Sequence, residues 1–82
     1  MITVDVKLFA IVRDIVGKDE VKISVEEQSS ATAVLDKLIL GFPRLAEWKS
    51  HLRVAVNSEY VPPEYLLKNN DEVAIIPPVS GG

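Results

Sequence analysis

Positions 2–9 of the sequence read ITVDVKLF, and this stretch decides what kind of domain the chain forms. Apolar side chains occupy the even positions, while the odd positions carry Thr3, Asp5, Lys7 and the aromatic Phe9. Because successive side chains of a β-strand point to opposite faces, this alternation is typical of a strand that is buried on one side. We therefore predict a half-buried strand whose apolar face packs against another element.

The rest of the sequence predicts an α+β domain with one helix long enough to cover a sheet. That helix should span residues 33–40, because the candidate N-caps Ser29, Ser30 and Thr32 precede it and Gly41 follows it. The other expected elements, in chain order, are a short helix at 10–16 ended by Gly17, a strand at 20–25, a short helix at 44–51, a strand at 52–56, a turn at 57–58, a short strand before Pro62–Pro63 and a strand at 72–76.

The composition is that of a single globular domain. The chain has 82 residues, of which 48% are hydrophobic and 26% charged, and its nine basic and twelve acidic residues give a net charge of −3. The basic residues form no cluster, so we expect no nucleic-acid partner. No apolar stretch approaches the roughly 20 residues of a membrane-spanning helix, and the first residues lack the pattern of a signal peptide. The expected location is the cytoplasm, without a membrane partner.

The sequence contains no cysteine. This excludes disulfides, thiolate zinc sites and cysteine nucleophiles, and it also excludes the transport of sulfur as a persulfide on this chain. The single histidine, His51, has no accompanying group of metal-ligating residues. We therefore expect neither a metal site nor a bound cofactor.

Positions 77–82 read PPVSGG and form the motif on which the chemistry depends. Pro77 and Pro78 have no backbone N–H and fix φ near about −65°, so they end the last strand and keep the following chain extended. We therefore divide the molecule into a globular domain at residues 1–76 and an extended tail at residues 77–82.

The last four residues are small: Val79, Ser80, Gly81 and Gly82. A tail of this kind is thin enough to enter a narrow slot in another protein, because glycine has no Cβ. Adenylation by a partner would turn the carboxyl group of Gly82 into an acyl donor that a sulfide equivalent could attack. A terminal Gly-Gly alone could be a frayed end, but a strand and two prolines directly before it favour a functional tail.

Three segments resemble the small subunits of molybdopterin synthase, a family of ubiquitin-like sulfur carriers. They are DEVAIIPPVSGG at 71–82, FAIVRDIVG at 9–17 and AVN at 55–57. The residues of the second segment that match the family are Phe9, Ala10, Arg13, Asp14, Val16 and Gly17. The segments are spread over the whole chain, and the length fits the family without insertions. The resemblance implies the β-grasp fold, in which the first and last strands are parallel neighbours at the centre of a mixed sheet of about five strands.

The resemblance also implies a function. An E1-like adenylating enzyme would activate Gly82 with ATP, and a sulfurtransferase would supply sulfur to form a thiocarboxylate. The tail would then enter the large synthase subunit and donate sulfur to cyclic pyranopterin monophosphate, which yields the dithiolene of molybdopterin. The chain would be the non-catalytic sulfur donor of a heterotetramer, and the residues that act on the pterin would belong to the large subunit.

Three alternatives remain open at the level of sequence. The first is another sulfur carrier of the same fold, such as the thiamin-pathway carrier, although Pro77–Pro78 argues against it. The second is a ubiquitin-like modifier that is joined through Gly82 to lysines of other proteins. The third is an interaction module in which the tail has no role.

Four residues outside the tail are candidates for the partner interface: Phe9, Arg13, Arg53 and Ile76. Phe9 falls on the polar side of its strand, where a large aromatic residue indicates a contact surface. If the alternate residues of the last strand face the helix, Ile76 points to the same side as Phe9, and Arg53 borders both. Arg13 could instead pair with a neighbouring carboxylate.

Overall fold

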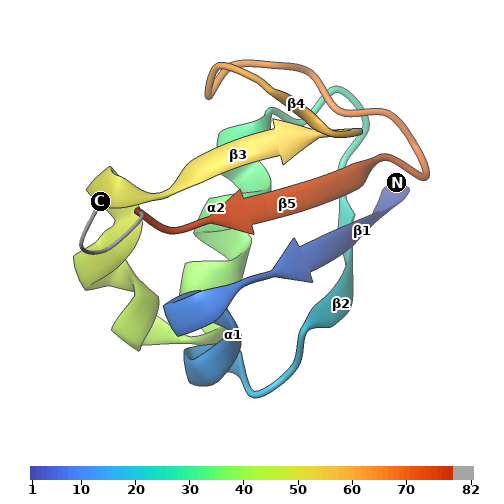
Figure 1. Ribbon diagram of the computed structural model, residues 1–82. Helices are drawn as coiled ribbons and strands as arrows, with labels where there is room; N and C mark the ends of the chain where they lie inside the picture. The colour runs from blue at the N-terminus through green and yellow to red at the C-terminus, as the bar shows by residue number, and fades with distance from the viewer. Residues whose placement is uncertain (79–82) are drawn as a thin grey trace.

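The computed structural model describes residues 1–78, and Figure 1 shows one mixed sheet with helices against one of its faces. The elements in chain order are β1 (Ile2–Leu8), α1 (Ala10–Val16), β2 (Glu20–Val25), α2 (Ala31–Gly41), the 3-10 helix η1 (Pro43–His51), β3 (Arg53–Val56), β4 (Glu59–Tyr60) and β5 (Glu72–Ile76). The predicted α+β class is confirmed.

The strand order of the sheet is β2-β1-β5-β3-β4. The central strands β1 and β5 run parallel, with Leu8 opposite Ile75, and the other neighbouring pairs are antiparallel. This arrangement is the β-grasp that the resemblance implied. It places the end of β1 beside the end of β5, where the tail begins.

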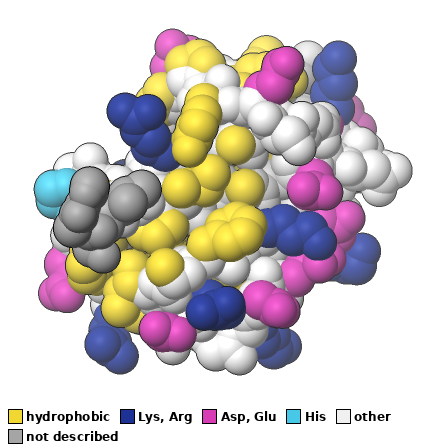
Figure 2. Space-filling model, viewed as in Figure 1, with side chains coloured by type: hydrophobic (Ala, Val, Ile, Leu, Met, Phe, Trp, Pro, Cys, Tyr) yellow, Lys and Arg dark blue, Asp and Glu magenta, His cyan; other side chains and the backbone are white. Residues whose placement is uncertain are grey.

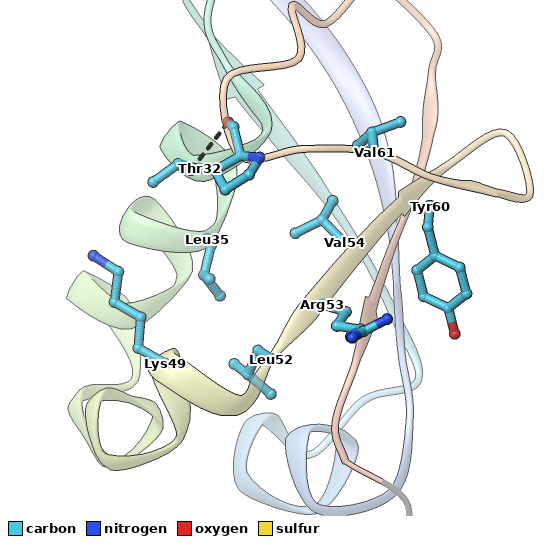
Figure 3. Close-up of a pocket in the computed structure, with 9 residues that line it drawn as sticks. Thr32, Leu35, Lys49, Leu52, Arg53, Val54, Tyr60 and Val61 are labelled. Carbon is cyan, nitrogen blue, oxygen red and sulfur yellow. Dashed lines mark hydrogen bonds between the residues drawn. The ribbon is translucent and has the colours of Figure 1, made fainter.

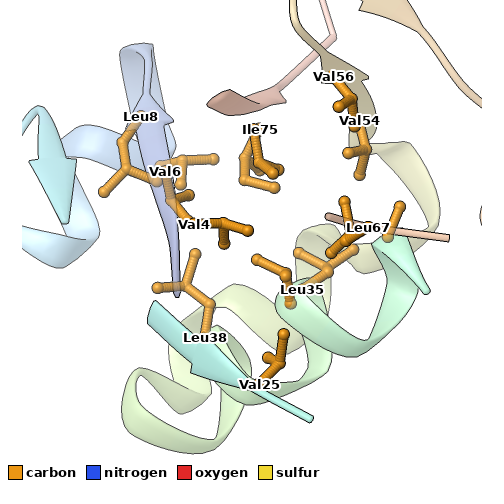
Figure 4. Packing of buried hydrophobic residues seen from close by; sticks show 14 of the residues in the cluster. Val4, Val6, Leu8, Val25, Leu35, Leu38, Val54, Val56, Leu67 and Ile75 are labelled. Carbon is orange, nitrogen blue, oxygen red and sulfur yellow. The ribbon is translucent and has the colours of Figure 1, made fainter. Parts of the chain in front are cut away.

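The core lies between the sheet and α2, as Figure 4 shows. All four even residues of β1 are buried, and Val4 and Val6 have no solvent exposure. Val34, Leu35 and Leu38 of α2 are also buried, so an apolar face of this helix meets the apolar face of the sheet. Each such side chain contributes about 1.5–3 kcal/mol when it leaves water.

Several boundaries differ from the prediction by one or two residues: β1 ends at Leu8 rather than at residue 9, α2 ends at Gly41 rather than at residue 40, and η1 begins at Pro43 rather than at residue 44. Helix α2 begins at Ala31 rather than at residue 33, because Thr32 is inside the helix and donates its hydroxyl to Pro63 O at 3.0 Å instead of capping it. Ser30 takes the N-cap position, but its side chain makes no cap hydrogen bond. Strand β3 begins at Arg53 rather than at Leu52, because Leu52 N donates to Lys49 O and closes η1.

A buried carboxylate connects the start of β5 to the β3–β4 turn. Asp71 is 8% exposed and accepts hydrogen bonds from Lys68 N at 2.8 Å and from Asn57 Nδ2 at 3.1 Å. Asn57 Oδ1 in turn accepts from Glu72 N at 3.0 Å. Asn57 and Ser58 have φ of 51° and 74°, which is the left-handed geometry of a tight hairpin turn. These contacts fix where β5 enters the sheet and therefore the line along which it leaves.

Candidate functional site

The end of β5 leads to the predicted reactive tail. Ile76 is half-buried, Pro77 is buried and Pro78 is exposed, so the described part of the chain ends at the surface. The predicted tail residues Val79, Ser80, Gly81 and Gly82 lie outside the described residues.

The sheet face that points away from α2 carries an apolar patch. Ala74 lies opposite Ala55 in β3, Ala55 lies opposite Tyr60 in β4, and Ile76 is two positions beyond Ala74 on the same face. Figure 2 shows hydrophobic side chains gathered across the middle of this face, with charged groups around them. We call the residues Phe9, Ala55, Tyr60, Ala74 and Ile76 the sheet-face patch.

Phe9 occupies the position predicted for it. It follows β1 with extended backbone angles of φ −131° and ψ 151°, so its side chain continues the outward parity of the strand, and it is 46% exposed. The next residue, Ala10, has φ of 50° and turns the chain sharply into α1. A non-glycine residue in this region costs about 1–3 kcal/mol, which the surrounding fold must offset.

Arg53 borders the sheet-face patch. It pairs with Ile76 across β3 and β5, and its guanidinium carbon lies 5.8 Å from the ring centroid of Tyr60. Arg53 is exposed and forms no ion pair with any residue of the described range 1–78. The structure therefore brings three of the four predicted interface residues, Phe9, Ile76 and Arg53, onto one face.

The fourth predicted residue, Arg13, belongs to α1. Its backbone N donates to Phe9 O at 3.3 Å, so it lies one helical turn after Phe9. Its side chain is exposed and has no ion-pair partner among residues 1–78. The carboxylate of Asp5, which the sequence also offered as a partner for Arg13, pairs with Lys22 at 2.9 Å.

The charged residues on the β1–β2 half of the sheet are already paired. The hydrogen bond from Lys7 to Glu20 raises the pKa of Lys7, and the hydrogen bond from Lys22 to Asp5 raises the pKa of Lys22. Both lysines therefore stay protonated to a higher pH than a free lysine. Arg53, at the other edge of the patch, has no such ion pair among residues 1–78.

Tyr60 and Ala55 are patch residues that the sequence did not identify as part of a surface. Tyr60 is 63% exposed and lies opposite Ala55. The two-residue turn at Asn57–Ser58 would have been a sufficient signal, because such a turn places Val56 opposite Glu59 and hence Tyr60 opposite Ala55.

A groove beside β3 was not predicted either. It has a volume of about 440 Å³ and lies between α2 and the β3–β4 edge of the sheet. Its lining comes from segments that are distant in the sequence, so no local sequence pattern predicts it.

Two further properties concern the described residues only. Within residues 1–78, no helix combines the length and the apolar character needed to cross a membrane. Over the same range, no group of three or more potential ligands is placed to hold a metal ion.

Comparison with known proteins identifies the family. The model of the ThiS family matches residues 6–82. The molybdopterin synthase sulfur carrier subunit of Arabidopsis thaliana is 37% identical over 99% of this chain and 84% of its own length, and that of Dictyostelium discoideum is 38% identical over 92% and 91%. The solution structure of the small archaeal modifier protein 1 from Methanosarcina acetivorans superposes with a TM-score of 0.82 at 32% identity, over 100% of this chain and 98% of that one. The chain belongs to the ThiS family, and it is similar to molybdopterin synthase sulfur carrier subunits along nearly its whole length.

Proposed function

We propose that this chain is the sulfur carrier subunit of a molybdopterin synthase and that it holds the transferable sulfur on Gly82. The observation that carries the proposal is its identity of 37% to a molybdopterin synthase sulfur carrier subunit over 99% of the chain. The ending PPVSGG, directly after β5, supplies a carboxyl group at the end of a slender tail.

The proposed loading takes place on partner enzymes. The carboxylate of Gly82 attacks the α-phosphorus of ATP on an E1-like enzyme, which releases pyrophosphate and leaves an acyl adenylate. A sulfide equivalent from a sulfurtransferase then attacks the acyl carbon and displaces AMP, so that a thiocarboxylate remains. The chain has no cysteine that could hold the sulfur as a persulfide, which supports the C-terminal acyl group as the position of the sulfur.

The proposed transfer takes place on the large synthase subunit. Each loaded tail carries one sulfur, whereas the dithiolene formed on cyclic pyranopterin monophosphate contains two. Two loaded carriers are consumed for each product, which fits a heterotetramer with two copies of each subunit. The groups that act on the pterin belong to the large subunit, and this chain contributes the acyl donor and the docking surface.

The proposed docking surface is the sheet-face patch with Arg53 at its border. Exposed aromatic residues and arginine are the types that most often dominate binding energy at interfaces. Because the patch includes Ile76, a partner that covers it also lies over the point where the tail leaves the domain. Docking and delivery of the tail are thereby coupled.

Intact mass spectrometry tests the loading step. The purified chain is incubated with the E1-like enzyme, ATP, the sulfurtransferase and its sulfur source. We expect a mass gain equal to the replacement of one oxygen by sulfur, located in the C-terminal peptide. A chain that lacks Gly82 is the control and should show no gain. Addition of the large subunit and cyclic pyranopterin monophosphate should then remove the sulfur and form molybdopterin. An unmodified wild-type carboxylate under these conditions contradicts the proposal.

A second candidate function is protein modification. The structural similarity to a small archaeal modifier protein favours it, because activation of a C-terminal glycine serves both outcomes. In that case the acyl group of Gly82 would be transferred to a lysine amine and form an isopeptide bond. Mass spectrometry of proteins purified with the tagged chain from cells separates the two functions, since a modifier leaves branched lysine peptides and a carrier leaves a thiocarboxylate.

A further inference from the structure

The groove between α2 and β3 has an apolar floor. Leu35 of α2, Val54 of β3 and the flanking residues Leu52 and Val61 line it, and Figure 3 shows these side chains around one common space. Its volume of about 440 Å³ falls within the range of roughly 300–1,000 Å³ that is usual for binding sites. The groove is therefore large enough for one bulky apolar side chain with part of its backbone.

The groove exists because the edge strand β4 contains only two residues. After Tyr60 the chain makes one more sheet contact, from Val61 N to Val54 O at 3.1 Å, and then leaves the sheet. Pro63 O is held by Thr32, which donates both its backbone N and its hydroxyl at 3.0 Å. The segment 61–63 is thus anchored at both of its ends, and it leaves the space beside the start of β3 uncovered.

Two cations stand at the rim of the groove. Lys49 pairs with Asp36 at 2.7 Å in an exposed ion pair, and such pairs contribute little to stability. Arg53 has no carboxylate partner within residues 1–78. A planar guanidinium is suited to bind a carboxylate with two parallel hydrogen bonds. The rim therefore favours an acidic group beside the apolar floor.

The groove is continuous with the sheet-face patch. Arg53 and Tyr60 line the groove and also stand on the outer face of the sheet, where Arg53 lies opposite Ile76. In Figure 3 both side chains lie at the margin of the pocket, on the other side of β3 from Leu35. A protein that lies on the patch can therefore reach the groove over these two side chains without crossing another element.

We infer that the groove receives a segment of the large synthase subunit in which a bulky apolar side chain stands next to a carboxylate. The apolar side chain enters between α2 and β3, and the carboxylate meets Arg53. The identity of the partner rests on the proposed function, whereas the chemistry of the segment follows from the groove itself. Such a contact would extend the interface around the β3–β4 edge and fix the orientation of the docked carrier.

Filling the groove tests this inference. Val61→Trp places a large ring in the opening, and Leu66→Trp adds the same ring at a residue that is 57% exposed and outside the groove lining. The dissociation constant for the purified large subunit should rise at least about tenfold for Val61→Trp, the equivalent of one excluded apolar side chain. Leu66→Trp should bind as the wild type does. Equal affinity of the two variants, with the fold of both verified by circular dichroism, overturns the inference.

A measurement on the wild-type chain avoids any effect of substitution on folding. The methyl groups of Leu52 and Val61, which are half-buried in the free chain, are observed by NMR with a paramagnetic agent dissolved in the buffer. In the saturated complex both should be protected from broadening, while Leu40 on the exposed side of α2 stays broadened. If the methyl signals of Leu52 and Val61 are broadened in a complex that still transfers sulfur, the groove contact is refuted while the proposed partner stands. Failure of the large subunit to bind the loaded chain refutes the proposed partner together with the groove contact.

Discussion

Arg53 and Ile76 lie directly opposite each other across β3 and β5, so an exposed guanidinium stands beside the last strand residue before the tail. On the other side of β5, β1 pairs in parallel through Leu8 and Ile75, and Phe9 follows directly. A basic, an aliphatic and an aromatic side chain therefore surround the point where the tail leaves the sheet. This placement follows from the β-grasp order, because the first and last strands are central neighbours.

Replacement of Phe9 by glutamate should weaken binding to the large subunit and to the activating enzyme. We expect a loss of at least ~2 kcal/mol, the usual cost at an interface hot spot, which corresponds to roughly a thirtyfold rise in the dissociation constant. The fold should survive, because Phe9 is 46% exposed. Leu40→Glu is the matched control, since Leu40 is 82% exposed and belongs to α2. Calorimetric titration of both variants against each partner measures the effect, and unchanged affinity of Phe9→Glu would place the interface elsewhere.

Two glycine substitutions should change stability in opposite directions. Gly17 caps the C-terminus of α1 with φ of 85° and donates its N–H to Arg13 O at 2.8 Å. Gly17→Ala should destabilise the domain by about 1 kcal/mol, because a side chain is strained in this backbone conformation even where space is free. Gly41 ends α2 without a positive φ and also has free space. Gly41→Ala should stabilise by up to about 1 kcal/mol, since alanine favours the helix. Thermal unfolding compares the two, and shifts of the same sign would contradict the expectation.

Removal of the buried carboxylate at Asp71 should loosen the start of β5. Asp71→Ala removes the acceptor of two part-buried hydrogen bonds, from Lys68 N and from Asn57 Nδ2, and a hydrogen bond to a charged group contributes about 1.5–3 kcal/mol. The neighbouring variant Glu72→Ala is the control, because Glu72 is exposed and its backbone N–H still donates to Asn57 Oδ1. Urea denaturation gives the free energy of unfolding of each variant. A loss at Asp71 no larger than that at Glu72 would show that these bonds add nothing to stability.

Local sequence patterns were sufficient for most of the fold. The alternation at residues 2–9 predicted β1, which ends one residue earlier, and its buried face, and Gly17 was correctly placed after a short helix. The sharp turn at Asn57–Ser58 was also predicted and has the left-handed φ values that such a turn needs. Each of these features depends on residues that are adjacent in the sequence, so the conformational preferences of those residues were enough to predict it.

Long-range contacts explain what the sequence did not predict. Thr32 has the side chain of an N-cap residue, but Pro63, which is 31 positions later, accepts its hydrogen bond, and the helix begins earlier. The same contact closes one end of the groove, so the groove also depends on a pairing that no local pattern contains. The contact between Arg53 and Tyr60 is different, because the local turn at Asn57–Ser58 places Tyr60 beside β3 and could have predicted it. Predictions about Gly82 and the rest of the tail rest on the sequence and the family.

Added bulk in the tail should slow the chemistry while the domain remains stable. Gly81→Val introduces a β-branched side chain where we propose that bare backbone enters a narrow slot, so adenylation and sulfur transfer should both slow sharply. The smaller variant Gly81→Ala should give an intermediate rate. Such a graded effect follows side-chain size and would not result from a change in charge or in folding stability. The melting temperature of both variants should equal that of the wild type, because the described core residues lie between Ile2 and Ile75. Rates of pyrophosphate release report the adenylation step, and single-turnover formation of molybdopterin reports the transfer. Wild-type rates for Gly81→Val would show that the partners do not enclose the tail, and the sulfur would then have to be transferred from a terminus held at an open surface.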